Sequence, residues 1–369
     1  MLNINKFNWV NNLTGQEIVN ISINNSKENE PKEETKEVSA SELRQDIVSG
    51  DWVVIATGRA KRPGDFANFE RNKDDKGIEE CLFEDPVASG QEKDVLIYHK
   101  ADGDWTLRVF PNKYPAFSQG ELPHPISEGP YFAMSGVGYH EIVVTRDHYR
   151  QLAMMDTMEI AEVFDAYQDR YLEHMNKKGV NYVTVFHNHG KEAGASISHP
   201  HSQLMAIPVV APYIKLELDG AEKYYKSNKE CVFCTMAEYE SEEGKRTIFE
   251  NEEFIAFCPF ASRAAFEVHV MPKKHSPYFE RINDEQKVKL AEVFGKALGA
   301  IYKALNDPPY NFYIHSAPCD GRDYPHFHWH IEILPHTATW AGFELDTGIE
   351  ISTLQPEVAA EFLRKQLEK

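Results

Sequence analysis

The chain has 369 residues, of which 42% are hydrophobic, and this length suits a globular protein of about two domains. Its formal net charge of −19 disfavours a general nucleic-acid surface, whereas a nucleotide pocket needs only a few local cations and backbone donors. The apolar runs fall short of the roughly 20 residues that a membrane span requires. The five cysteines are too sparse for a disulfide scaffold, so we expect a cytoplasmic protein.

The first 41 residues are predicted to form a flexible tail. Residues 24–38 are highly charged and carry almost no apolar side chains, so they cannot bury enough surface to offset the entropy cost of ordering. We expect ordered structure to begin near Glu42, ahead of the strand-like run 52–56.

After the tail, the same series of elements is predicted to occur twice. Each copy contains a cysteine, a strand, a helix with apolar residues at three- and four-residue spacing, a second strand and a histidine-rich segment. In the first copy these lie at Cys81, 141–145, 160–171, 181–187 and 199–203. In the second copy they lie at Cys231, 266–272, 290–305, 310–315 and 326–330. Each half, 42–212 and 213–369, is therefore predicted to be an α+β unit, an antiparallel sheet with covering helices.

The segment 198–203 is the most informative motif in the chain. Alternation in an extended segment places His199, His201 and Gln203 on one face, and Pro200 stiffens the backbone between the histidines. Two imidazoles and a carboxamide in this arrangement can bind a metal and attack a phosphorus atom. The alternative interpretation is a pair of surface histidines flanking a turn proline.

Small residues precede this motif, at Gly190, Gly194, Ala195 and Ser196. Because they lack large side chains, the backbone N–H groups of this loop can approach a phosphate closely. The loop is therefore predicted to bind an anion beside the histidine motif.

Several longer blocks carry a resemblance to a known family. They are Leu43–Asp46, Arg59–Pro63, Arg108–Pro115 and Gly138–Glu141 in the first half, and Leu305–Asn311 and Gly342–Glu344 in the second. With these blocks, residues 42–367 resemble the galactose-1-phosphate uridylyltransferases, the nucleotidyltransferase branch of the histidine-triad superfamily. The two blocks of the second half are most similar to ADP-glucose phosphorylases. The resemblance implies two tandem histidine-triad-like halves.

The resemblance implies that His201 is a nucleophile, which attacks the α-phosphorus of a nucleotide sugar and holds the nucleotide as a covalent phosphoramidate. The ordinary pKa of imidazole, near 6.5, suits this role because a neutral nitrogen is available at neutral pH. Gln203 would donate its amide N–H to a phosphoryl oxygen. Since glutamine cannot protonate a leaving group, we expect phosphate exchange rather than hydrolysis.

The same resemblance implies further binding residues. Phosphate oxygens would be bound by Ser196 and Asn188, the ribose and base by Asn112, and the hexose hydroxyls by Glu344. Arg59 and Arg62 would supply cationic contacts, which in this family often come from the neighbouring subunit, so a homodimer is implied. The alternative interpretation of the two arginines is a solvated basic turn.

A zinc site is predicted in the second half. Cys231 and Cys234 have the spacing of zinc ligands, and His275 with His328 would complete a tetrahedral site of two cysteines and two histidines. By alternation, another histidine of 326–330 could replace His328. A redox dithiol is disfavoured because no helix-start pattern follows Cys234.

A corresponding zinc site in the first half would use Cys81, His148 and His199. Glu84 stands where a second cysteine is commoner, and a carboxylate oxygen can also bind zinc, with a weaker or different metal preference. The alternative is a vestigial site with Glu84 merely solvated. A metal here would be structural and would position His199 and, through it, the adjacent nucleophile.

We expect a nucleotidyltransferase that acts on a nucleotide sugar with a sugar 1-phosphate or phosphate, first of all a UDP-glucose:hexose-1-phosphate uridylyltransferase. The close alternative is phosphorolysis of ADP-glucose, because Ala338 and Glu350 stand where the better-known uridylyltransferases carry Lys and Gln. A nucleotide hydrolase that uses 326–330 and a zinc-stabilised nucleotide-binding protein are the remaining hypotheses.

Overall fold

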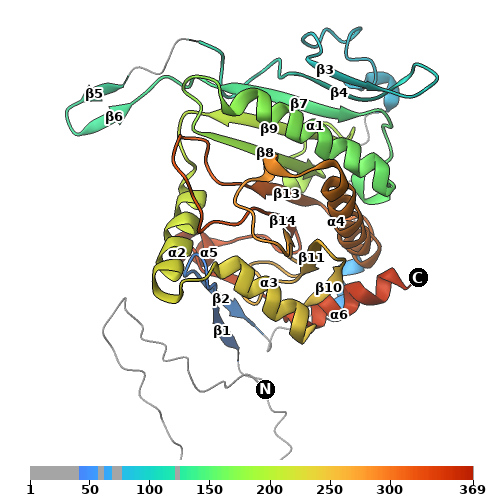
Figure 1. The fold of residues 1–369 in the computed structure, drawn as a ribbon. Coiled ribbons are helices and arrows are strands. Elements are labelled where there is room, and N and C mark those ends of the chain that lie inside the picture. Colours follow the sequence, from blue (N-terminus) through green and yellow to red (C-terminus); the bar gives the residue numbers. More distant parts are fainter. Residues whose placement is uncertain (1–40, 57–61, 69–76, 121–124, 369) are drawn as a thin grey trace, which may run out of the picture. The chain divides into compact units, whose positions relative to one another are not determined.

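The computed structural model describes residues 41–56, 62–68, 77–120 and 125–368 (Figure 1). Almost all of the predicted tail, and Arg59, lie outside the described residues. The described residues belong to one compact unit. Within them, every helix is too short or too polar to span a bilayer.

A ten-stranded antiparallel sheet runs through both halves, in the order β10-β11-β12-β14-β13-β8-β9-β7-β4-β3. The first half supplies β3 (Leu96–His99), β4 (Trp105–Pro111), β7 (Tyr139–Thr145), β8 (Tyr182–His189) and β9 (His201–Ile207). The second half supplies β10 (Thr247–Glu250), β11 (Phe254–Phe257), β12 (Val268–Pro272), β13 (Tyr310–His315) and β14 (His330–Pro335). The predicted α+β class, with antiparallel strands in each half, is confirmed. The boundary after residue 212 stays a prediction.

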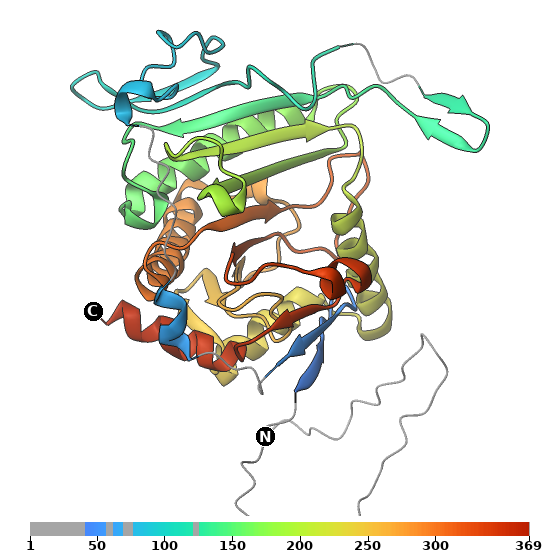
Figure 2. The same ribbon diagram turned by 180° about the vertical axis from the view of Figure 1, so that it is seen from behind.

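Two long helices, α1 (Thr157–Met175) and α4 (Asp284–Leu305), pack side by side on one face of this sheet (Figures 1 and 2). Each begins with a capping box, which satisfies the free N–H groups of its first turn. Their apolar stripes meet at Phe164 and Phe294, whose ring centroids are 5.3 Å apart. The core therefore lies between these helices and the sheet.

The opposite face of the second half is covered by other elements. They are α2 (Pro212–Asn228), α3 (Val232–Glu243) and a small sheet of β1 (Glu42–Gln45), β2 (Trp52–Ile55) and β15 (Glu350–Ser352). Leu218 of α2 and Phe233 of α3 belong to one apolar cluster with Phe257 of β11. On the same face of the first half, a smaller cluster contains Phe83 and Phe110.

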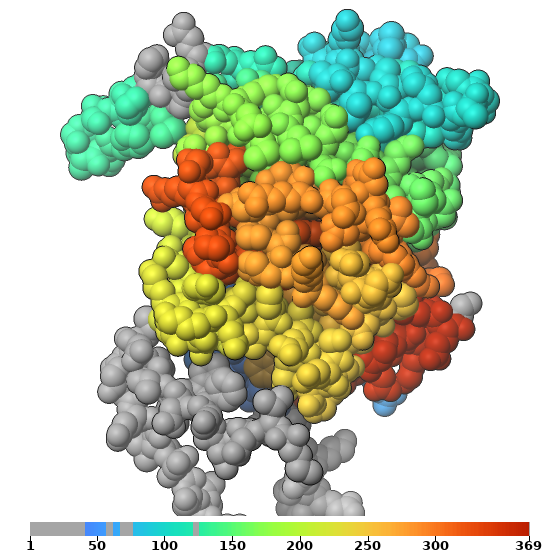
Figure 3. All heavy atoms as spheres, in the orientation of Figure 1, coloured from blue at the N-terminus to red at the C-terminus, as the bar shows by residue number. Residues whose placement is uncertain are grey.

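The remaining elements are a hairpin, two C-terminal helices and several short 3-10 turns, and α6 adds Ala359, Ala360 and Leu363 to the main core. The hairpin of β5 (Ile126–Glu128) and β6 (Tyr131–Ala133) is fully exposed and extends beyond the surrounding surface (Figure 3). Two helices near the C-terminus are α5 (Gly342–Thr347) and α6 (Pro356–Leu367). Short 3-10 turns lie at Pro63–Asn68, Ile78–Glu80, Leu152–Met154, Lys191–Ala193 and Phe279–Arg281.

Candidate active site and metal centres

Strand β9 places alternate side chains of the histidine motif on opposite faces of the sheet. Ser202 points to the face covered by α1, where its Oγ lies 2.9 Å from Nδ1 of His187. His201 and Gln203 therefore lie together on the other face. Asn188 joins them there, because it follows His187 on β8, which pairs with β9.

The backbone holds the imidazole of His201 in one orientation. Its Nδ1 lies 2.8 Å from the carbonyl oxygen of His199, so Nδ1–H donates and Nε2 keeps a lone pair. The residue is 6% exposed, and burial lowers the pKa of His201, although the hydrogen bond to His199 acts in the opposite direction. The ring of Phe83 packs against it, with centroids 5.0 Å apart. His201 therefore offers an unprotonated Nε2 at neutral pH.

A second histidine orients the amide of Gln203. The N–H of Ala116 donates to Nδ1 of His140 at 3.2 Å, so the ring proton of His140 must lie on Nε2. This Nε2–H donates to Oε1 of Gln203 at 2.8 Å. Burial lowers the pKa of His140, which favours this neutral form. With its oxygen occupied, Gln203 presents its NH₂ group to the site.

The position of Asn112 agrees with a place beside this pair. Its Nδ2 lies 3.2 Å from Nε2 of His140, where two donors meet without a hydrogen bond in this tautomer, and its Oδ1 accepts from the N–H of Tyr114 at 2.9 Å. Sequence reasoning gave His140 no role, although it lies in one of the blocks that carry the family resemblance. A role for His140 becomes evident only from the contact of its ring with Gln203 in the folded structure.

The loop that precedes the motif turns tightly, as its glycines predict. Gly190 and Gly194 both have φ of +86°, a conformation that favours glycine. However, the N–H groups of Ala193, Gly194 and Ala195 donate to carbonyl oxygens within the loop. These three groups are not available to a phosphate, contrary to the expected backbone cradle. The side chains of Asn188 and exposed Ser196 are better placed as donors.

Two of the predicted binding residues make their hydrogen bonds with other parts of the chain. Arg62 is exposed, and its backbone N–H donates to Oδ2 of Asp65 at 2.9 Å. Glu344 lies in α5, where its carboxylate accepts from the N–H of Ala341 at 3.0 Å. In the described part of the chain, no hydrogen bond or ion pair joins either residue to His201.

The predicted metal ligands Cys81, His148 and His199 of the first half lie close together. Ligand atoms of Cys81, His148 and His199 all lie within 4.8 Å of one another. His199 donates from Nε2 to the carbonyl oxygen of Thr145 at 2.7 Å, so its Nδ1 lone pair faces Sγ of Cys81 at 3.5 Å. Burial lowers the pKa of His199 to about 4, which favours the neutral ligand form.

Glu84 lies at the edge of this group. One oxygen, Oε1, accepts from Arg146 at 2.6 Å, while Oε2 is buried and lies 3.9 Å from Nδ1 of His199. Oε2 has no hydrogen-bond partner among the described residues. A buried carboxylate oxygen without a donor fits a metal ligand, so the donor set suits Zn²⁺ with one oxygen in place of sulfur.

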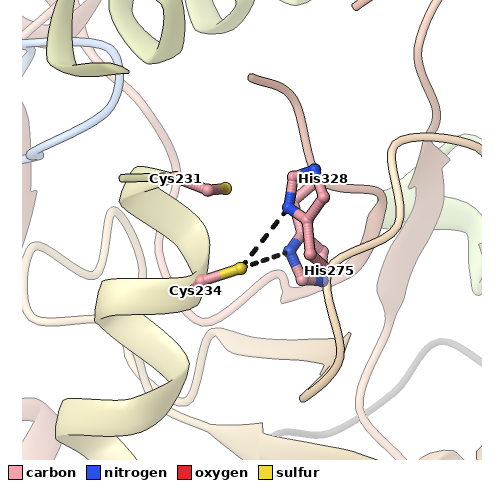
Figure 4. A group of neighbouring side chains, drawn as sticks. All are labelled: Cys231, Cys234, His275 and His328. Atoms are coloured by element: carbon pink, nitrogen blue, oxygen red, sulfur yellow. Dashed lines mark hydrogen bonds between the residues drawn. The ribbon is translucent and has the colours of Figure 1, made fainter. Parts of the chain in front are cut away.

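The four predicted ligands of the second half also converge (Figure 4). Sγ of Cys234 lies 3.4 Å from Nδ1 of His275 and 3.4 Å from Nδ1 of His328. Cys231 is the residue before α3, and Cys234 lies in its first turn. The expectation that no helix-start pattern follows Cys234 is corrected by α3, which already begins at Val232. Its N-cap residue, Cys231, makes no side-chain cap hydrogen bond, so the usual start signal is missing from the sequence. Two sulfurs and two imidazole nitrogens at these distances fit a structural zinc site.

Sequence reasoning missed a largely buried charged cluster on the face of the second half that α2 covers. It consists of Glu217, Arg263, Glu267, His269, His315, His330 and Glu332. His330 and Glu332 occupy on β14 the alternate positions that His201 and Gln203 occupy on β9. In this half, however, Glu217 of α2 lies 3.1 Å from His315 and closes the face. The members of this charged cluster are up to 115 residues apart in the sequence, from Glu217 to Glu332, and no local sequence pattern relates them.

Comparisons with known proteins agree with this geometry. A family model described as the N-terminal domain of galactose-1-phosphate uridyl transferase matches residues 30–211, and a domain of unknown function, DUF4921, matches 126–369. An ADP-glucose phosphorylase of Arabidopsis thaliana is 34% identical over 89% of this chain and 94% of its own length. A galactose-1-phosphate uridylyltransferase of Thermotoga maritima is 30% identical over 88% and 98%.

Solved structures show the same likeness. A crystal structure of an ADP-glucose phosphorylase from Arabidopsis thaliana with bound ADP-glucose matches with a TM-score of 0.73 and 32% identity, covering 88% of this chain and 99% of that one. Sequence relatives, solved structures and the paired histidine-rich halves thus point to one family. The chain belongs to the family of galactose-1-phosphate uridylyltransferases and ADP-glucose phosphorylases.

Proposed function

We propose that the protein transfers a nucleotidyl group from a nucleotide sugar to a phosphate, with His201 as the covalent carrier. The observation that carries this proposal is the Nδ1–H bond from His201 to the carbonyl oxygen of His199 at 2.8 Å. It fixes the neutral tautomer whose Nε2 lone pair lies on the same face as the amides of Gln203 and Asn188. An imidazole in this state is a nucleophile without a separate base.

The reaction runs in two displacements at one phosphorus atom. Nε2 of His201 attacks the α-phosphorus, an N–P bond forms, and the P–O bond to the sugar phosphate breaks, releasing sugar 1-phosphate. An oxygen of the second phosphate then attacks the same phosphorus, the N–P bond breaks, and the imidazole is restored. Gln203 and Asn188 donate N–H groups to the oxygens on which negative charge develops.

ADP-glucose with inorganic phosphate is the substrate pair that we favour, ahead of UDP-glucose with a hexose 1-phosphate. The relative named ADP-glucose phosphorylase is 34% identical and the uridylyltransferase 30% identical, which supports this order. The residues Ala338 and Glu350 support it as well, since they depart from the uridylyltransferase pattern. UDP-glucose stays the second candidate because both relatives align over nearly their full length.

Zn²⁺ would be held by Cys231, Cys234, His275 and His328, and by Cys81, Glu84, His148 and His199, where it would supply rigidity. The chain's own groups do the chemistry. We further propose that Arg59, Arg62 and Glu344 act across a homodimer, which agrees with the hydrogen bonds that Arg62 and Glu344 make elsewhere in the described part of the chain.

Intact-mass measurement after separate exposure to ADP-glucose and UDP-glucose tests the proposal. We expect a mass gain of one nucleoside monophosphate with the true donor, loss of that gain in His201→Asn, and its removal by the true phosphate acceptor. The matched control is His326→Ala, a half-buried histidine of the second-half segment, which should keep the adduct. An adduct that persists in His201→Asn, or no adduct with either sugar, would overturn it.

A further inference from the structure

The end of β8 and the loop after it contact a turn of the second half. Nε2 of His189 lies 2.7 Å from Oδ1 of Asp307, the residue that follows the left-handed Asn306. A Cβ added to Gly190 would come within 2.8 Å of Pro309, so the two backbones are closely packed there. The chain on either side of His189 therefore contacts residues that lie more than a hundred positions away in the sequence.

The centre of this contact is a pair of asparagines in register. Asn188 of β8 pairs with Asn311 of β13 at the seam between the halves. On its other side, β8 pairs with β9, where Asn188 and His201 share a face. Three neighbouring strands thus bring Asn311, Asn188 and His201 onto one face of the sheet.

The hydrogen bonds of Asn311 leave one amide orientation. Its Nδ2 donates to Oδ1 of Asn188 at 2.7 Å and to the carbonyl oxygen of Ala193 at 2.9 Å. Its Oδ1 lies 2.6 Å from Nε2 of His336, which must therefore carry the proton. Each polar atom of Asn311 has a partner of the correct type, and a flipped amide would set its oxygen against the carbonyl oxygen of Ala193, which can only accept.

This chain of bonds also sets the orientation of Asn188. Because Oδ1 of Asn188 accepts from Asn311, its NH₂ group faces the other way. That group lies 3.9 Å from the point where a Cβ on Gly194 would stand, so it faces the loop at Gly194. The same amide turned round would present an oxygen to a phosphate and repel it.

We propose that Asn311, held by His336, is a positioning residue of the second half that turns the NH₂ group of Asn188 toward the transferred phosphoryl group. The inference rests on the proposed function of this site. Since a hydrogen bond to a charged group is at stake, loss of the orientation should slow nucleotidyl transfer by about tenfold to a hundredfold.

The test is a double-mutant cycle between Asn311→Leu, which has nearly the same shape, and Asn188→Ala. The readout is the single-turnover rate of adduct formation, with thermal unfolding to follow the fold. If Asn311 acts through Asn188, the double variant should be no slower than Asn188→Ala alone. Losses that multiply, or an Asn311→Leu variant as fast as the parent, would overturn the proposal.

A second pair of variants keeps the test valid should Asn311→Leu fail to fold. His336→Leu removes the donor to Oδ1 of Asn311, whereas His336→Gln restores an N–H group. We expect slow transfer in the first and recovery in the second, and equal rates in both would contradict the proposed chain of bonds.

Binding separates this inference from the proposed function. Calorimetric titration with ADP should show the same non-additive loss of affinity in the Asn311 and Asn188 variants, whether or not the protein turns over a nucleotide sugar. A parent protein that forms no adduct yet shows this pattern would disprove the reaction and retain the positioning role. Additive losses of ADP affinity would disprove the positioning role itself.

Discussion

Nδ1 of His201 and the carbonyl oxygen of His199 lie 2.8 Å apart, so the proposed nucleophile is bonded to the backbone of a candidate metal ligand. His199 is itself fixed, because its Nε2 donates to Thr145 and its Nδ1 faces Cys81. A metal at this site would therefore act on the orientation of the nucleophile rather than on the phosphate.

Replacement of Gln203 by glutamate should slow nucleotidyl transfer by at least about a hundredfold, because it removes an N–H donor and adds a negative charge beside the phosphate. The carboxylate would still accept from His140, so the loss would not arise from unfolding. Single-turnover mass measurement gives the rate. Gln45→Glu, an exposed change in β1, is the control and should transfer at the parent rate. A Gln203→Glu variant within threefold of the parent would contradict the role of the amide.

The Cys234→Ser variant should lose about one equivalent of zinc and unfold at a lower temperature. The reason is that the second-half site has four ligands from separate elements, and its metal would link them. Elemental analysis and thermal unfolding measure the two effects. Cys319→Ser is the matched control, since Cys319 is half-buried and belongs to none of the metal-ligand groups of the described residues. Equal zinc content in both variants would rule out this site.

Glu84→Cys should make the first-half site retain zinc longer against a chelator than the parent does, because it restores a second sulfur ligand. Glu84→Gln should release zinc faster, since the amide is a weaker ligand than the carboxylate. Release is followed with a coloured zinc indicator. If all three proteins release zinc at the same rate, Glu84 lies outside the coordination sphere.

The Arg263→Met variant should destabilise the protein strongly. The guanidinium of Arg263 contacts Glu332 at 2.5 Å and Glu267 at 3.1 Å, and both carboxylates are almost fully buried. Removing this guanidinium leaves two buried carboxylates with histidines as their remaining cationic neighbours, and breaking a buried ion pair costs about 3–5 kcal/mol. Urea denaturation measures the free energy of unfolding.

An exposed ion pair supplies the comparison for this variant. Lys226→Met breaks the pair with Glu222 on the surface of α2, and such pairs contribute about 0–1 kcal/mol. Similar losses in the two variants would mean that the buried cluster is not held by its charges.

The stability of the protein should fall below about pH 6.5 because of His187. Burial lowers the pKa of His187 well below its ordinary value of 6.5, so the folded state keeps it neutral while the unfolded state binds a proton. Its contribution is complete above pH 6.5 and is lost as the pH falls toward the lowered value, by about 1.4 kcal/mol per pH unit for one proton.

His187→Gln should flatten this dependence, which urea denaturation at several pH values would measure. His99→Gln is the control, because His99 is exposed and should leave the pH dependence unchanged. A parent and a His187 variant with the same slope below pH 6.5 would show that other groups dominate.

The sequence determined the features that depend on local spacing. Apolar residues every three or four positions gave α1 and α4, and alternation in 199–203 predicted that His201 and Gln203 share a face. The pair Cys231 and Cys234 was readable for the same reason, because ligand spacing within one turn is a local property.

Only the tertiary structure decided which distant groups meet. The contact of Asn188 with Asn311 depends on the register of β8 against β13, and that of Glu217 with His315 depends on where α2 packs. Such pairings are set by the burial of apolar surface between layers, which many residues share. No periodicity in the sequence indicates these long-range pairings. The surroundings of the proposed nucleophile therefore follow only from the way both halves form one sheet.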